Sequence, residues 1–277
     1  MNEPEGIKMT EEKKTENAAG ETPLVASEYP MTGLALLALP AWEPAMLRES
    51  LLSDWQIDPG EPPASVQEPW IFTVDGSLVV IGLEPHPVPD NAADLQAKNS
   101  PEWPGAVEAA QTHQAYLAVA VIAQQTSLVE NARTAVKILG SLSSEPNVRA
   151  VNAASRLYSP EAYRKGALAM KQNERVFPIF NLIFFGVWTP VEGGRPAGYT
   201  VGLDRFGAPE VEILESPLQP MELRAQLVHA AMMQISRGRA FDDGEEIELG
   251  GVEFRAARKP SVALPDVITS QLEPVKA

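Results

Sequence analysis

Residues 70–83, which read WIFTVDGSLVVIGL, constrain the fold of this chain more than any other segment. Two runs rich in β-branched and aromatic residues flank Asp75-Gly76. An Asp-Gly pair between two such runs is the strongest short signal for a β-hairpin. Continuous apolar runs at 33–39 (GLALLAL) and 115–123 (AYLAVAVIA) predict two further strands, both buried.

Helical patterns separate these strands. Pro44 suits a first helical turn, and Leu47, Leu51 and Trp55 follow at intervals of four residues. A second helical stretch covers about 104–112. The first half therefore has the order β-α-β-β-α-β, which predicts a ferredoxin-like layer.

The second half carries strong helix boundaries and more strands. Ser127 and Glu130 form a capping box for a helix that we expect to stop at Gly140. Ser159-Pro160 opens another helix, and the last long helix runs from Pro220 to Gly238. Apolar and alternating runs supply the remaining strands, so we predict an α+β fold with mixed or antiparallel sheets, helices on one face and a β-rich second half.

The ends of the chain differ from its middle. Residues 1–28 are rich in Glu, Lys, Thr and Asn, a composition that predicts a disordered acidic tail. We expect one domain over 29–262, divided at most into lobes 29–155 and 156–262, and a flexible C-terminal tail over 263–277.

Composition excludes several classes of protein. The chain has 277 residues, 44% of them hydrophobic, and no cysteine, which excludes disulfides, a thiolate nucleophile and cysteine-bound metals. Its longest apolar run, 176–188, is shorter than the ~20 residues that a membrane helix needs. The N-terminus has no apolar segment typical of a secretory signal, so we expect a cytoplasmic protein without membrane insertion.

The net charge of −15 also restricts the partners. Such a charge repels nucleic acids and anionic membranes, so we expect neither as a partner. Residues 204–253 hold eleven acidic and four basic residues, a net charge of −7. This segment is either a solvated face that keeps the protein soluble or a docking surface for a basic protein partner.

Four segments carry a resemblance to a known family. They are LLSDW (51–55), GSLVVIGLEPHPVPD (76–90), EWPGAVEAAQTHQAYLAVAV (102–121) and YTVGLDRFGAPEVEI (199–213). Together they resemble an uncharacterised bacterial family, domain of unknown function 4261. The family has no assigned activity, and some members look like components of toxin–immunity or secretion-linked loci. The resemblance therefore implies a binding role more than a catalytic one.

Residues for chemistry are few. The histidines, His86, His113 and His229, have no metal-binding spacing, and no cofactor motif occurs, so we expect neither metal nor cofactor. His86 is either an ordinary loop residue or a general base assisted by Glu84 or Asp90. We expect His113 to be structural, at a helix C-terminus, and His229 to face solvent. The acidic run FDDGEEIEL (241–249) fits a turn better than a Ca²⁺ or Mg²⁺ site.

Two functions from different classes follow. The first is a non-catalytic, immunity-like or secretion-linked interaction module that presents an acidic surface to a partner. In YTVGLDRFGAPEVEI (199–213) a hairpin turn accounts for most residues. A turn does not, however, need the guanidinium of Arg205 or the ring of Phe206 at its tip. The expected partner-binding residues are Arg205, Phe206, Trp188, Asp242, Asp243 and Glu245. The alternative is a hydrolase or transferase with a site near His86, Asp204 and Arg205.

Overall fold

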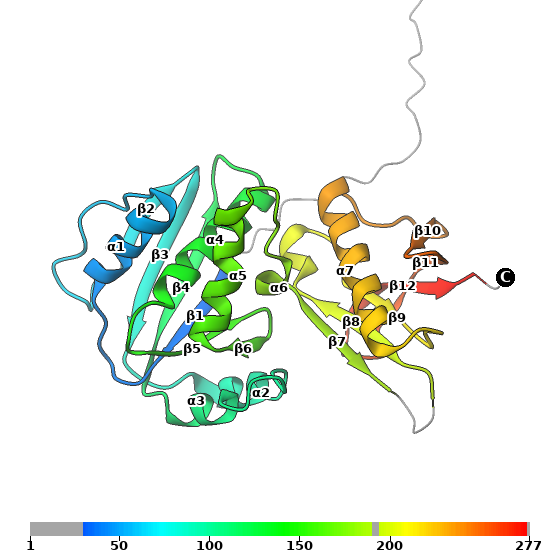
Figure 1. Ribbon diagram of the computed structural model, residues 1–277, viewed down its shortest axis with the longest axis horizontal. Helices are drawn as coiled ribbons and strands as arrows, with labels where there is room; N and C mark the ends of the chain where they lie inside the picture. Colours follow the sequence, from blue (N-terminus) through cyan, green and yellow to red (C-terminus); the bar gives the residue numbers. More distant parts are fainter. Residues whose placement is uncertain (1–29, 190–193, 276–277) are drawn as a thin grey trace, which may run out of the picture.

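A computed structural model describes residues 30–189 and 194–275. These residues form two six-stranded sheets with helices packed against them, arranged side by side as two lobes (Figure 1). The predicted α+β class is confirmed. The tail predicted over 1–28 lies outside the described residues.

The first sheet is antiparallel throughout, in the order β2-β3-β4-β1-β5-β6. Its strands are β1 (Met31–Leu37), β2 (Trp70–Val74), β3 (Ser77–Glu84), β4 (Ala115–Ala123), β5 (Val148–Ala153) and β6 (Arg156–Tyr158). The predicted hairpin is confirmed as β2 and β3, with Gly76 at φ +79° in the turn. The β-α-β-β-α-β order holds along the chain, but β4 lies between β3 and β1, so chain order alone does not establish a ferredoxin-like layer.

Helices cover both faces of this sheet. One face carries α1 (Pro44–Trp55), α4 (Leu128–Leu142) and α5 (Pro160–Gln172). The other carries α2 (Ala92–Ala97) and α3 (Ala106–Thr112), which follow the short helix η1 (Pro89–Asn91). Leu36 packs under α2 and α3, whereas its neighbour Leu37 belongs to the main core. The prediction placed helices on one face, but a strand that is apolar on both sides must be covered on both.

The helix starts agree with the sequence, and one helix end does not. Ser127 Oγ accepts a hydrogen bond from Glu130 N, and Ser159 Oγ accepts one from Ala162 N, so both predicted serine N-caps are confirmed. The reciprocal bond of the predicted capping box, from Ser127 N to the Glu130 side chain, is not found among the described residues. The predicted stop at Gly140 is wrong, because α4 continues to Leu142. A Cβ at position 140 would lie 2.6 Å from Ala167 Cβ, so this glycine permits close packing of α4 on α5.

The second sheet has the order β10-β11-β12-β9-β8-β7. Its strands are β7 (Phe184–Trp188), β8 (Ala197–Val201), β9 (Val211–Ile213), β10 (Glu246–Leu249), β11 (Val252–Pro260) and β12 (Ile268–Pro274). The helix α7 (Pro220–Arg237) packs over β7, β8 and β9 (Figure 1). A short helix, α6 (Ile179–Leu182), precedes β7, and the one-turn helix η2 (Leu203–Phe206) joins β8 to β9.

The two lobes share one apolar core, which includes Leu139 of α4 and Leu203 of η2. The rings of Phe177 and Phe206 meet edge to face at 6.0 Å between centroids, and Arg133 donates to the carbonyl oxygen of Val176 at 3.0 Å. The predicted lobe boundary at 155/156 is too early. Because β6 pairs with β5 and α5 packs on α4, the first lobe extends through Gln172.

The predicted flexible tail over 263–277 is wrong for most of its length. β12 lies inside the second sheet, antiparallel to β11 and parallel to β9. The carboxylate of Glu212 on β9 explains this order, because it is fully buried and accepts hydrogen bonds from Ser261 Oγ, Val262 N, Ala263 N and Gln271 Nε2 at 2.8–3.1 Å. One side chain thus fixes both β12 and the loop that leads to it.

We expect Glu212→Ala to lower the free energy of unfolding by on the order of 3–5 kcal/mol, because it leaves several buried donors without an acceptor. Chemical denaturation of the full chain measures the loss. The control is Glu248→Ala, an exposed glutamate of β10, which should change stability by less than about 0.5 kcal/mol. Equal stabilities of the two variants would contradict this role of Glu212.

Candidate functional site

The residues of the predicted hydrolase or transferase site lie in different lobes. His86 follows β3 of the first sheet, where its Nε2 lies 3.5 Å from Glu84 Oε2 and its ring meets Tyr116 edge to face. Asp204 and Arg205 lie in η2, between β8 and β9 of the second lobe. Within 30–189 and 194–275, no hydrogen bond or ion pair joins His86 to either residue. The geometry brings together His86 and Glu84 only.

The other two histidines occupy different environments. His113 is buried, its Nε2 accepts a hydrogen bond from Val88 N at 2.9 Å, and its Nδ1 lies 2.6 Å from Ala110 O. Both ring nitrogens therefore contact backbone groups, which agrees with the structural role expected of His113. His229 is exposed on α7.

Phe206 is not the exposed contact that the sequence predicted. β8 and β9 pair antiparallel as expected of a hairpin, but η2 connects them and turns the Phe206 ring into the shared core, where it is 2% exposed. Glu210 holds this turn, since its Oε1 accepts from Gly202 N, Leu203 N and Asp204 N, and its Oε2 accepts from Thr200 Oγ1. Burial raises the pKa of the Glu210 carboxyl, against the opposing effect of these hydrogen bonds.

The acidic segment is less available than its composition indicates. Glu210 and Glu212 are buried, and Glu245 forms ion pairs with Arg237 and Arg239, each at 2.9 Å. Burial opposes ionisation of Glu245, but hydrogen bonds from Arg239 and from the Asp242 backbone lower its pKa. Of the expected partner-binding acids, only Asp242 and Asp243 have exposed side chains, and Asp242 also pairs with Arg239.

Trp188 lies at the end of β7 in a hollow lined by both lobes, a cavity of about 640 Å³ that we call the inter-lobe cleft. The first lobe contributes Lys98, Asn99, Glu102 and Arg156. The second contributes all of β7 together with Tyr199, Met221, Arg224 and Val262. A smaller hollow of about 340 Å³ shares Glu102, Arg156 and Arg224 with it and continues toward Tyr158 and Phe180.

The polar side of the cleft is cationic. Arg156 forms an ion pair with Glu102 Oε1, and its guanidinium lies 4.7 Å from the centroid of the Tyr158 ring. Its Nε is buried and has no hydrogen-bond partner in the described part of the chain. Arg224 lies over Phe180, 5.5 Å from the ring centroid. Lys98 adds a third cation, so the described residues that line the cleft of this acidic protein include three bases and one acid.

These charges and the protein around them set the ionisation of Glu102 in the cleft and of Tyr158 in the smaller hollow. Partial burial raises the pKa of Glu102, but the hydrogen bond and charge of Arg156 and the charge of Arg224 outweigh it, so that this pKa lies below its ordinary value. Burial raises the pKa of Tyr158 to about 12, and its hydroxyl donates to Phe180 O. Near neutral pH the cleft therefore presents an ionised Glu102, and the smaller adjoining hollow presents a neutral Tyr158.

The apolar side of the cleft comes from β7 and its neighbours. The Tyr199 ring meets Trp188 at 5.5 Å and Phe184 at 5.9 Å, both edge to face. Met221 and Val262 on the rim are 84% and 66% exposed. Arginine, tyrosine, tryptophan and methionine together are typical of binding surfaces rather than of solvated ones.

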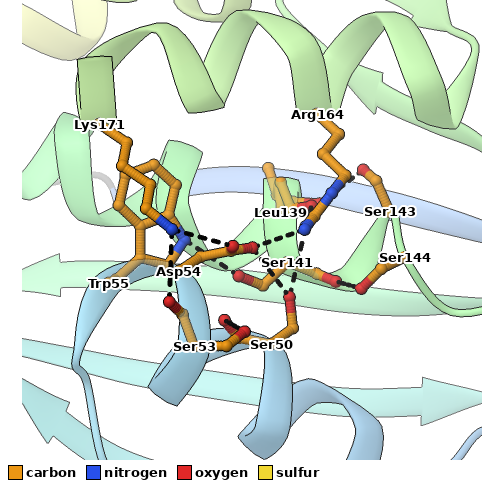
Figure 2. Close-up of polar contacts among 11 residues, drawn as sticks. Ser50, Ser53, Asp54, Trp55, Leu139, Ser141, Ser143, Ser144, Arg164 and Lys171 are labelled. Carbon is orange, nitrogen blue, oxygen red and sulfur yellow. Dashed lines mark hydrogen bonds and ion pairs between the residues drawn. The ribbon is translucent and has the colours of Figure 1, made fainter. Parts of the chain in front are cut away.

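A second polar cluster, around Asp54, joins α1, α4 and α5 (Figure 2). Asp54 Oδ2 accepts from Arg164 at 2.6 Å, Asp54 Oδ1 lies 3.4 Å from Lys171 Nζ, and Trp55 Nε1 donates to Ser141 Oγ at 3.1 Å. Every one of these contacts is between helices of the same layer. The cluster therefore works as a clamp within the first lobe, and the described residues contain no group of three or more potential metal ligands there or elsewhere.

Comparison with protein-family models, curated proteins and solved structures finds no match to this chain. In the described residues, no helix is both long and apolar enough to cross a bilayer. The geometry of the inter-lobe cleft is therefore the main guide to function.

The buried position of Phe206 predicts that Phe206→Ala lowers the free energy of unfolding by about 3–5 kcal/mol. Phe180→Ala, which truncates a ring that is 51% exposed, should cost about 1 kcal/mol or less. Thermal and chemical unfolding of both variants measures the difference. If Phe206→Ala left the stability unchanged, the ring would not be part of the core, and the predicted surface contact would be favoured again.

The clamp predicts that Asp54→Ala destabilises the first lobe by roughly 1–3 kcal/mol, because Arg164 loses a partly buried carboxylate. The control is Glu49→Ala, an exposed residue of the same helix, with an expected change of less than about 0.5 kcal/mol. Denaturation curves that coincide for the two variants would show that the ion pairs contribute nothing.

Proposed function

We propose that this protein is a non-catalytic interaction module of the cytoplasm, which binds another protein through the inter-lobe cleft. The observation that supports this most is the exposed apolar rim beside partly buried aromatic residues and cationic residues. Met221 and Val262 remain exposed although both are large and apolar. Apolar side chains that gather beside arginine and aromatic groups mark protein-binding surfaces.

The charges favour this cleft over the acidic segment as the binding surface. Glu210, Glu212 and Glu245 satisfy partners within the chain, so they contribute to the fold rather than to a docking face. In the cleft, Arg224 lies over the Phe180 ring and forms no ion pair within 4 Å with a described residue, and Arg156 Nε has no acceptor among those residues. A partner that supplies acceptors would pair with the exposed guanidinium of Arg224, whereas Arg156 Nε is enclosed by the protein.

The geometry gives the enzymatic alternative no comparable support. A general base must lie within hydrogen-bond reach of the groups that it serves, or one water molecule away. His86 contacts neither Asp204 nor Arg205 in the described residues, and it pairs with Glu84 at an exposed position. The resemblance to domain of unknown function 4261, with its immunity-like or secretion-linked members, agrees with a binding role.

Site-specific photocrosslinking in the native cells tests this proposal. A photoreactive residue replaces Met221 in the cleft, Asp243 in the acidic segment or Ile71 on β2, an exposed position of the far sheet edge. We expect a covalent protein adduct from position 221, identified by mass spectrometry, and none from the other two. An adduct from position 243 alone would indicate that the acidic segment, and not the cleft, binds the partner. The absence of an adduct from position 221 would contradict the proposal.

A further inference from the structure

The two sheets end at the cleft in edge strands that differ in one respect. Figure 1 shows β6 at the side of the first lobe nearest the second, and β7 at the side of the second lobe nearest the first. On β6, Leu157 has both backbone groups occupied, since Leu157 N donates to Ser100 Oγ at 3.0 Å and Ser100 Oγ donates to Leu157 O at 2.6 Å. A single serine thus closes this edge to another strand.

The edge at β7 is open. Phe184 to Trp188 pair with β8 on one side, and no other backbone hydrogen bond of these five residues is found within the described chain. In an edge strand, alternate residues direct their N–H and C=O groups away from the sheet, where they can pair with another strand. The sequence FFGVW contains neither the charge nor the proline that commonly protects such an edge. At the opposite edge of the same sheet, β10 carries exposed Glu246 and Glu248.

The cleft provides the space beside this edge. All five residues of β7 line the cavity of about 640 Å³. A strand of five residues spans roughly 17 Å, enough to pair with a segment of similar length. The exposed side chains of Met221 and Val262 lie where an added segment would cover apolar surface.

The charges in the cleft indicate which segment fits. Among the described residues that line the cleft, Lys98, Arg156 and Arg224 are basic and only Glu102 is acidic, and Glu102 already pairs with Arg156. Arg156 is 8% exposed and retains an unpaired Nε in the described structure, and Arg224 is exposed. Charge-assisted hydrogen bonds from arginine to a carboxylate are stronger than neutral ones, so acidic side chains are preferred here.

We propose that an extended, acidic segment of a partner protein adds to the second sheet as a strand beside β7, with its carboxylates on Arg224 and Arg156. This rests on the proposed function and specifies the chemistry of the partner. Main-chain hydrogen bonds to β7 supply affinity, and the alternate side chains of the segment supply specificity. The acid–arginine contacts fix which segments are accepted.

The test uses the full chain and a displayed library of random peptides of roughly ten residues. Enriched peptides should carry Asp or Glu among β-forming residues and should shift the amide resonances of 184–188, with those of β2 (70–74), another sheet edge, as the internal control. Methylation of alternate backbone nitrogens of such a peptide should weaken binding at least ~10-fold, because it removes donors to β7. Arg224→Ala should weaken binding roughly 5–10-fold, and the exposed control Arg149→Ala should leave it unchanged.

Several results would overturn this inference. Enrichment of basic peptides, enrichment of no peptide, or binding that survives backbone methylation would each contradict it. If N-acetylglutamate bound as tightly as the peptides, the cleft would be a site for small anions instead. The outcome is separable from the proposed function. If position 221 gives a protein adduct but no segment pairs with β7, the proposal of a partner in the cleft stands and the proposal of an added strand is wrong.

Discussion

A buried carboxylate that pairs with no cation among the described residues holds the second lobe together. Glu212 is 0% exposed, and its oxygens accept from two backbone amides, a hydroxyl and a side-chain amide. Removing a carboxylate from water costs several kcal/mol unless hydrogen bonds replace the lost hydration. Because these donors come from the 261–263 loop and from β12, the chain must close on β9 before the carboxylate is satisfied.

The candidate site depends on this closure. Val262 and Ala263, which donate to Glu212, also line the inter-lobe cleft. On the other side of β9, Glu212 is the register partner of Tyr199 on β8, and that ring supports Trp188. One glutamate therefore positions both the rim and the aromatic floor of the cleft, although its side chain does not enter it.

Local signals in the sequence predicted most elements of the fold. The Asp75-Gly76 turn, the serine caps and Pro220 each act within a few residues, so a single sequence contains the information. β12 was missed because its segment, ITSQLEP, contains polar residues that are typical of a surface. Thr269, Ser270 and Gln271 are nonetheless buried, and Gln271 donates to Glu212 and to Pro260 O. Such partners are far away in sequence, so no local pattern could reveal them.

Of the residues expected to bind a partner, Trp188 lines the cleft that we propose as the binding site, and the other five do not. Arg156, Arg224 and Glu102 come from three segments with no common spacing, and they meet only because β6 and α7 lie on opposite sides of the cleft. Phe206 was assigned to a binding surface but lies in the core. An aromatic residue in a turn usually indicates a surface contact, but here the hydrogen bonds to Glu210 fold the turn into η2, which directs the ring inward.

The protein is negatively charged overall, whereas the described residues of the cleft are mainly basic. The overall charge therefore acts on a partner at long range and the cleft residues act on it at short range. At physiological salt the field of exposed charges decays over about 8 Å, so the net charge of −15 neither guides an acidic segment toward the protein nor acts strongly inside the cleft. Within the cleft, Arg156 is almost fully enclosed by protein, and its interactions are screened far less. Selectivity for acidic side chains is therefore exerted after contact. An open backbone edge at β7 complements this arrangement, because main-chain hydrogen bonds provide affinity that does not depend on electrostatic attraction at a distance.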